Sequence, residues 1–316
     1  MDEREVRRRI EAHPVEAPPE TMRAAFEALA DLETDPRGCT IERRRIGGLD
    51  VDVVVPPGGP GPATLVHLHG GGYVFGSARS HRRLGIELAV ASGCELWLPD
   101  YPLAPERPWP FARLATARLV RAALSDESGR ERALVLGGDS AGGHLALATL
   151  LSGEPGLAAV AAVVLFSPNT LRDYSLTRTR DANAAADAMN DPERDDALAR
   201  LAFGDGDPAD PERTLVNAPL HTLPPVYLDV GGDEVLLDDA LVFARAAAHA
   251  GVEVELRVRP GVFHMSQLFA QHWRVADESL ADAGAWAAAR LAARSRRDRH
   301  AVAPHGSARP GVRVRG

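Results

Sequence analysis

The stretch Gly138-Asp139-Ser140-Ala141-Gly142 decides the fold, because a strand pattern precedes it and a helix pattern follows it. Residues 132–137 form a short apolar run flanked by charge and glycine, and residues 144–151 have a helix-forming composition. Ser140 is therefore expected on a strand-to-helix turn, a strained backbone position that only small neighbours permit. Its hydroxyl would stand exposed above a sheet edge, at a helix N-terminus that favours developing negative charge.

Composition restricts the class of protein. A chain of 316 residues can bury a full core, and its 45% hydrophobic and 25% charged residues are typical of a globular protein. The formal charge of −8 argues against a nucleic-acid partner.

Cys39 and Cys94 are too few and too far apart for a disulfide framework or a zinc site, so we interpret them as buried thiols. The charged residues 1–10 precede no apolar stretch, so we expect a cytoplasmic protein without signal peptide or membrane span, and a homodimer stays open.

Strands alternate with helices over the central part of the chain. Residues 40–46 and 49–55 read as a hairpin around Gly47-Gly48. Apolar runs then start near residues 63, 94, 132, 160, 226 and 252, with helical patterns over 81–91, 111–124, 142–151, 236–250 and 279–293. This alternation predicts an α/β fold with a mostly parallel, doubly wound sheet, helices on both faces, and sites at the carboxyl ends of the strands.

Two segments break the alternation and predict a helical cap. Residues 1–39 contain two amphipathic helices, at 2–13 and 19–32, before any strand. The core would then span residues 40–293, with an insertion at about 170–223 that carries a helix over 192–203 and is too long for a simple connection. Residues 294–316 are basic and unpatterned, so we expect a disordered tail.

A serine nucleophile needs a base and a carboxylate downstream, and both follow predicted strands. Asp233 follows the strand at 226–230, and His264 follows the strand at 252–258. Their loops would lie on the same sheet edge as Ser140, so that His264 deprotonates the serine and Asp233 orients the imidazole. Rival acids and histidines lie nearby, namely Asp229, Glu234, Asp238, His249 and His272.

The stretch His69-Gly70-Gly71-Gly72 follows another predicted strand and can hold a tetrahedral oxyanion. Consecutive glycines let main-chain N–H groups point into a cavity, and we assign the N–H groups of Gly71, Gly72 and Ala141 as donors. His67 and His69 are spaced like metal ligands on a strand, but no third ligand is evident, so we expect no metal and interpret His69 as a brace for its loop.

The chain resembles the hormone-sensitive lipase-like family of α/β-hydrolases. The resemblance rests on His69-Gly-Gly-Gly-Tyr73, on Asp100-Tyr-Pro-Leu-Ala-Pro-Glu106 and on residues 137–143, together with Asp233 and His264 in their loops. It implies hydrolysis of carboxylic esters with short or medium acyl groups through an acyl-enzyme, without a cofactor, under a cap made of the N-terminus and an insertion.

Some features near the expected site bear on the substrate. Tyr73 follows the oxyanion glycines and is expected to border the acyl pocket, and Ser266 stands where the family often has an aromatic residue, which would make the alcohol side more polar. The family's usual Asp-Pro-Leu is Asp233-Glu234-Val235 here, which predicts a different shape for the acid loop. A lactonase, a deacetylase of a secondary metabolite, and a non-catalytic receptor on the same fold stay open as alternatives.

Overall fold

An eight-stranded sheet forms the centre of the described residues, which are 1–61, 63–124 and 132–302 of a computed structural model. Its order is β1-β2-β4-β3-β5-β6-β7-β8, and the pairs β1–β2 and β2–β4 are antiparallel while the others are parallel. The strands are β1 (Thr40–Ile46), β2 (Leu49–Val55), β3 (Ala63–Leu68), β4 (Glu95–Asp100), β5 (Ala133–Asp139), β6 (Ala162–Phe166), β7 (Val226–Gly231) and β8 (Val254–Arg259). The predicted α/β fold with a mostly parallel sheet is confirmed.

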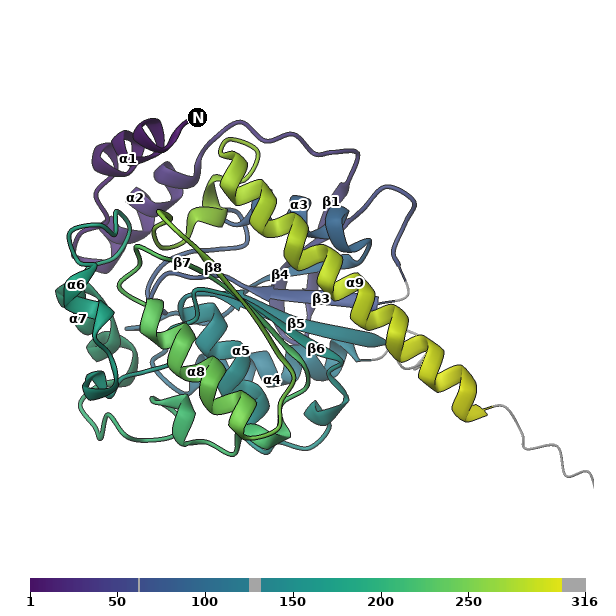
Figure 1. The fold of residues 1–316 in the computed structure, drawn as a ribbon. Helices are drawn as coiled ribbons and strands as arrows, with labels where there is room; N and C mark the ends of the chain where they lie inside the picture. Colours follow the sequence, from purple (N-terminus) through teal and green to yellow (C-terminus); the bar gives the residue numbers. More distant parts are fainter. Residues whose placement is uncertain (62, 125–131, 303–316) are drawn as a thin grey trace, which may run out of the picture.

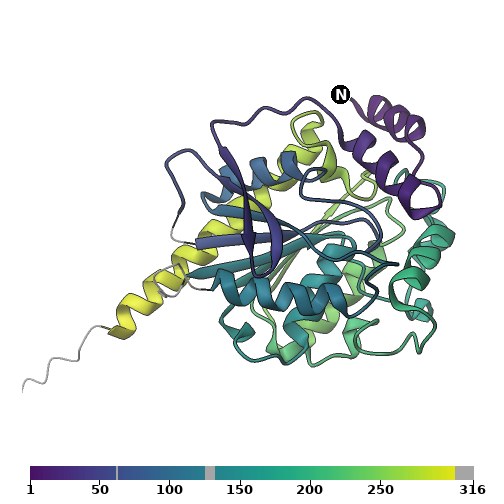
Figure 2. The ribbon, with the colours of Figure 1, turned by 180° about the vertical axis from the view of Figure 1, so that it is seen from behind.

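Helices cover both faces of this sheet (Figures 1 and 2). One face packs against α3 (Arg82–Ser92) and α9 (Arg274–Val302), and the other packs against α4 (Phe111–Ala123), α5 (Ala141–Leu151) and α8 (Leu237–His249). Successive strand residues point to opposite faces. Because helices pack on both faces of the sheet, the central strands β3 and β6 are buried along their whole length, and their sequences are mostly apolar.

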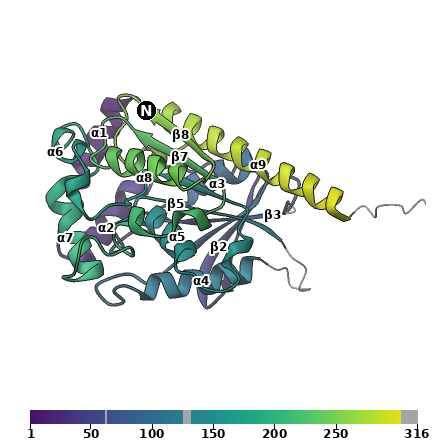
Figure 3. The ribbon, with the colours of Figure 1, turned by 60° about the horizontal axis from the view of Figure 1, so that its bottom comes forward.

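A cap of four helices lies together at one end of the sheet (Figures 1 and 3). It combines α1 (Glu3–Ala12) and α2 (Pro19–Ala30) from the N-terminus with α6 (Thr179–Ala182) and α7 (Pro192–Phe203) from the insertion after β6. Helix α2 buries Met22, Phe26, Leu29 and Ala30, which lie on one face at helical spacing. The insertion also contains the short 3₁₀ segments η2 (Tyr174–Leu176), η3 (Leu215–Asn217) and η4 (Leu220–Thr222), which the sequence pattern did not predict.

The structure differs from the sequence prediction at the C-terminal end. Helix α9 continues to Val302, so the predicted disordered tail from residue 294 begins as helix, and residues 303–316 lie outside the described residues. Its alanines and arginines have good helix propensity, which lets the helix extend beyond the sheet that it covers (Figure 1). Within the described part of the chain, no helix is both long and apolar enough to span a membrane.

Candidate active site

Ser140 occupies the sharp turn between β5 and α5. Its backbone has φ 52° and ψ −121°, a left-handed conformation that is strained for a residue with a side chain. The turn is possible because Gly138 and Gly142 approach each other closely: a Cβ on Gly138 would lie 2.4 Å from the carbonyl carbon of Gly142. A Cβ on Gly142 would lie 2.0 Å from the carbonyl oxygen of Leu68. The predicted strained strand-to-helix turn is therefore confirmed.

Three buried side chains form a continuous hydrogen-bonded row at this turn. The Nε2 atom of His264 lies 2.9 Å from Ser140 Oγ, and its Nδ1 atom lies 2.8 Å from Glu234 Oε2. Because a carboxylate only accepts hydrogen bonds, Nδ1 carries the proton and Nε2 is free to accept the serine proton. The serine is 7% exposed, so the row can be reached from the cavity described below.

The predicted meeting of Ser140 and His264 is confirmed, but the placement of Asp233 beside His264 is wrong. Asp233 is partly exposed and contacts the histidine loop through its main chain, with its N–H 3.0 Å from Val262 O. The next residue, Glu234, points inward and is 1% exposed. Its Oε1 atom accepts hydrogen bonds from Ser167 Oγ and Gly231 N, both at 2.6 Å, which hold the carboxylate under the imidazole.

The other candidate acids and histidines lie away from this row. Asp229 is paired with an arginine at the end of β8, and Asp238 accepts a hydrogen bond from a main-chain N–H at the start of α6. His249 and His272 each form a hydrogen bond with a main-chain carbonyl oxygen elsewhere. Glu234 is one of the rival acids, but nothing in the local sequence distinguishes it from Asp233, because the turn after β7 decides which of the two side chains faces inward.

The charges around His264 favour its protonated form. Burial lowers the pKa of this imidazole, but the hydrogen bond and negative charge of Glu234 outweigh it, and Asp187 and Asp139 add to the effect, so that the pKa is raised. The neighbouring carboxylates stabilise the imidazolium form in this buried site. The neutral imidazole can therefore accept a proton readily.

Two cap residues that sequence reasoning missed hold the loops of Glu234 and His264. The Nδ2 atom of Asn183 donates to the carbonyl oxygen of Glu234 at 2.8 Å. Asp187 accepts hydrogen bonds from the N–H groups of Val235 at 3.0 Å and His264 at 3.2 Å. Burial, together with the charge of Glu234, raises the pKa of Asp187 to about 6 despite the favourable charge of His264. The cap therefore fixes the main chain on both sides of the imidazole.

The glycine loop after β3 lies beside the serine. Gly71 has φ 118° and Gly72 has φ 57°, and a Cβ on Gly71 would lie 2.2 Å from Phe75 O. His69 braces this loop as predicted, because its Nδ1 is 2.9 Å from Gly70 O and its ring stacks on Tyr101 at 4.1 Å. Ala141 is the first residue of α5, a position whose N–H is not used by the helix's own hydrogen bonds.

Two histidines form hydrogen bonds with Asp139, the residue that precedes Ser140. Nε2 of His67 lies 2.9 Å from one carboxylate oxygen of Asp139, and Nε2 of His81 lies 3.2 Å from the other. Burial disfavours the Asp139 carboxylate, but the two imidazoles outweigh it and hold its pKa well below the usual range. Among the described residues, no group of three or more His, Cys, Asp or Glu side chains is arranged to hold a metal ion.

A cavity of about 30 Å³ opens onto Ser140 and His264 between the sheet edge and the cap. Its wall is partly apolar and partly polar, and it includes Gly71 and Gly72. The apolar part comes from Val15, Phe26, Phe75, Met189, Leu198 and Met265, and the polar part from Asn169, Asn190, Arg194 and Asp195.

Tyr73 and Ser266, the predicted substrate contacts, are not among the residues that line this cavity. The Tyr73 hydroxyl forms a hydrogen bond with His144 Nδ1, and its ring packs edge-on against Phe203. Ser266 is 2% exposed at the start of η5 (Ser266–Phe269). Neither side chain lines this cavity, and their role as substrate contacts stays a prediction.

Comparison with known proteins gives consistent matches. A family model described as alpha/beta hydrolase fold matches residues 65–268. An esterase of Acinetobacter venetianus is 32% identical over 225 residues, which cover 69% of this chain and 72% of that protein. An acetyl-hydrolase of Streptomyces hygroscopicus is 34% identical over 213 residues, covering 66% and 68% respectively. The crystal structure of a hormone-sensitive lipase from a metagenome library superposes with a TM-score of 0.82 at 32% identity, covering 92% of this chain and 99% of that one.

Proposed function

The chain belongs to the hormone-sensitive lipase-like family of α/β-hydrolases and is a carboxylic ester hydrolase, and from this premise we propose that it cleaves esters of short to medium acyl chains with Ser140 as nucleophile. The observation that carries this proposal is the unbroken row from Ser140 Oγ through the imidazole of His264 to the Glu234 carboxylate.

The reaction proceeds through an acyl-enzyme. His264 Nε2 takes the proton of Ser140 Oγ as the oxygen bonds to the ester carbonyl carbon, and the imidazolium is stabilised by Glu234. The carbonyl oxygen becomes an oxyanion that the N–H groups of Gly71, Gly72 and Ala141 stabilise. Collapse of this intermediate breaks the bond to the alcohol oxygen, which receives the proton from His264. Water then repeats the sequence on the acyl-enzyme, releases the acid and restores the serine.

The size of the cavity supports short acyl groups. Its volume of about 30 Å³ is small, and Leu198 of α7 lies so close to Gly72 that a Cβ there would be 2.6 Å from the leucine Cδ1. The similar protein of Streptomyces hygroscopicus is named as an acetyl-hydrolase, which agrees with a small acyl group. Since each buried methylene contributes about 0.8 kcal/mol, preference should change gradually with chain length until the cap obstructs the chain.

The proposal is tested with p-nitrophenyl esters from acetate to decanoate, using the wild-type protein and Ser140→Ala. We expect turnover that peaks at short chains and falls by about 10⁵-fold in the variant, because the nucleophile is lost while the fold is kept. Retention of the folded state is checked by thermal unfolding. Turnover that survives the substitution would remove Ser140 from the mechanism, and a maximum at decanoate would contradict the proposed chain length.

A further inference from the structure

Asn169 is a polar side chain of the cavity that the proposed mechanism does not use. It lies just after β6, and its main-chain N–H donates to the carbonyl oxygen of Ser140 at 3.1 Å. Its side chain is 3% exposed and lines the cavity together with Ser140 and His264. Asn169 is therefore held beside Ser140 by its own backbone, at the wall of the same cavity.

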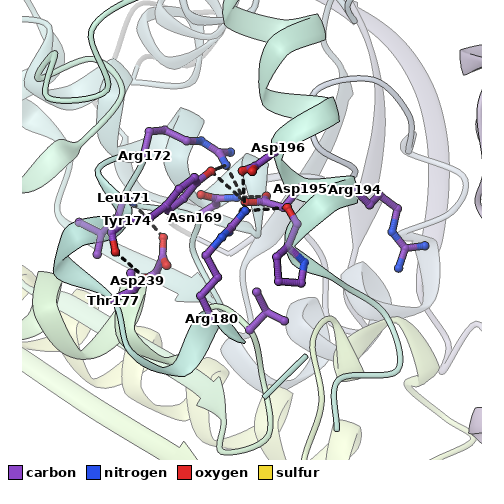
Figure 4. Close-up of polar contacts among 12 residues, drawn as sticks. Asn169, Leu171, Arg172, Tyr174, Thr177, Arg180, Arg194, Asp195, Asp196 and Asp239 are labelled. Carbon is purple, nitrogen blue, oxygen red and sulfur yellow. Dashed lines mark hydrogen bonds and ion pairs between the residues drawn. The ribbon is translucent and has the colours of Figure 1, made fainter. Parts of the chain in front are cut away.

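The orientation of the Asn169 amide is determined by Asp195 of the cap. Its Nδ2 atom donates to Asp195 Oδ1 at 2.8 Å, and Asp195 Oδ2 accepts from Arg172 Nη1 and Arg180 Nη1, also at 2.8 Å each (Figure 4). Burial disfavours the charge on Asp195, but the two guanidinium groups outweigh it and lower its pKa to about 2. An ionised carboxylate offers acceptors only, so the amide nitrogen must face it and the amide oxygen must face away.

The oxygen left over has no partner. Asn169 Oδ1 is buried and receives no hydrogen bond from the residues that the structure describes. A buried acceptor without a donor is unfavourable unless something else satisfies it. The amide cannot flip without breaking the hydrogen bond between its Nδ2 atom and Asp195. A hydrogen-bond donor for Oδ1 must therefore approach the oxygen where it now lies.

We propose that Asn169 Oδ1 accepts a hydrogen bond from the substrate, so that the preferred esters carry a hydroxyl or amide N–H close to the ester carbonyl. An ester with a purely hydrocarbon acyl or alcohol part leaves this oxygen unpaired and is the poorer substrate. A site built around a hydrogen bond discriminates against analogues that lack the donor. The inference rests on the proposed function, since it takes Ser140 to be the nucleophile, and it adds the chemical class of the substrate.

The test uses two pairs of esters that differ by one hydroxyl group. On the acyl side these are p-nitrophenyl butyrate and p-nitrophenyl 3-hydroxybutyrate, and on the alcohol side ethyl butyrate and 2-hydroxyethyl butyrate followed by pH-stat. For each pair, the ratio of kcat/KM values is divided by the ratio of the hydroxide-catalysed rates, which removes intrinsic reactivity. The proteins are the wild type, Asn169→Leu, Asn169→Ser as a milder change that keeps a polar group, and Asn190→Ser as a control in the same cavity.

In the wild type, the corrected ratio should favour the hydroxylated ester in at least one pair. It should fall by about 3- to 10-fold in both Asn169 variants, the effect of one neutral hydrogen bond, and stay unchanged in Asn190→Ser. A purely structural role for Asn169 would lower both esters of a pair equally and leave the ratio unchanged, which would overturn the inference. So would a wild-type ratio without preference in either pair, or a change confined to Asn190→Ser. Failure of the wild type to hydrolyse p-nitrophenyl butyrate would instead contradict the proposed function.

Discussion

The turn that carries Ser140 and the loop that carries Glu234 both follow parallel strands, but they are held in different ways. At the serine, backbone approaches backbone: Gly138, Gly142 and the carbonyl of Leu68 leave no room for side chains. At the acid, polar contacts from distant parts of the chain hold the loop: Ser167 Oγ donates to the Glu234 side chain, and Asn183 of the cap donates to its main-chain carbonyl oxygen. The first arrangement is marked in the local sequence by its glycines, whereas the sequence of the acid loop does not mark the polar contacts that hold it.

The sharpest test of the acid loop compares Glu234→Gln with Asp233→Asn. We expect Glu234→Gln to lower kcat by about 10³- to 10⁴-fold, because the imidazolium loses its counter-charge and the tautomer is no longer enforced. Asp233→Asn should stay within about threefold of the wild type, since its side chain does not reach His264. Steady-state kinetics on one nitrophenyl ester decide the matter, and the reverse order of effects would return the acid role to Asp233.

The steric character of the serine turn is tested by Gly142→Ala against Gly232→Ala in the acid loop. A Cβ on Gly142 would lie 2.0 Å from a main-chain oxygen, whereas on Gly232 the nearest heavy atom would be 3.2 Å away. We expect the first substitution to lower the free energy of unfolding by roughly 2–4 kcal/mol and the second by less than about 1 kcal/mol. Denaturant unfolding measures both, and equal losses would show that the two regions tolerate new atoms alike.

The polar character of the acid loop is tested by Asn183→Ala. Loss of its hydrogen bonds to Gly232 O and Glu234 O should lower kcat by about 3- to 10-fold with little change in KM, because the carboxylate is less well positioned. Asn217→Ala is the matched control, since its Nδ2 also donates to a carbonyl oxygen, Ala209 O at 2.8 Å, but on the exposed part of the insertion. If both variants behave alike, the cap does not act through the acid loop.

The smallest expected effect concerns Asp187→Asn and the pH dependence of kcat/KM. In the proposed mechanism the neutral form of His264 is the active base, so activity should fall as pH decreases through the pKa of this histidine, which is raised partly by the charge of Asp187. Removing that charge lowers the pKa and moves the acidic limb to lower pH by a few tenths of a unit. The effect of the substitution on kcat/KM should be greatest above pH 6. The pKa of Asp187 is about 6, so at lower pH its carboxyl group is already largely neutral and has little charge to lose.

The control for this profile is Asp173→Asn, which removes a half-buried carboxylate of the same insertion that is hydrogen-bonded to Ser175 rather than to the loops of Glu234 and His264. Its acidic limb should coincide with that of the wild type. A limb that moves upward in Asp187→Asn would mean that Asp187 does not favour the imidazolium.

Much of the fold was predictable from the sequence because its signals are local. The ranges of β1, β2 and α7 agree with the predicted ones, since hairpin glycines and a proline at the helix start mark their ends. Helix α9 ends beyond the predicted residue 293, because a basic alanine-rich segment has the propensity to continue a helix. Within the cap, the sequence indicated the helix over residues 192–203 but not the hydrogen bonds of Asn183 and Asp187, which join residues far apart in the chain.

By itself, the sequence determined the position of Ser140 and of the glycine loop at Gly71 and Gly72, because glycine spacing dictates local backbone geometry wherever a side chain would clash. It also placed His264 in the loop after β8. Only the tertiary structure decided between Asp233 and Glu234, which differ by one position in a turn. The hydrogen bond from Asp233 N to Val262 O and the contact of the Glu234 side chain with Ser167 place Glu234, and not Asp233, beside His264. Contacts with residues from other parts of the chain decide which side chain faces His264, so the sequence of the turn does not predict it.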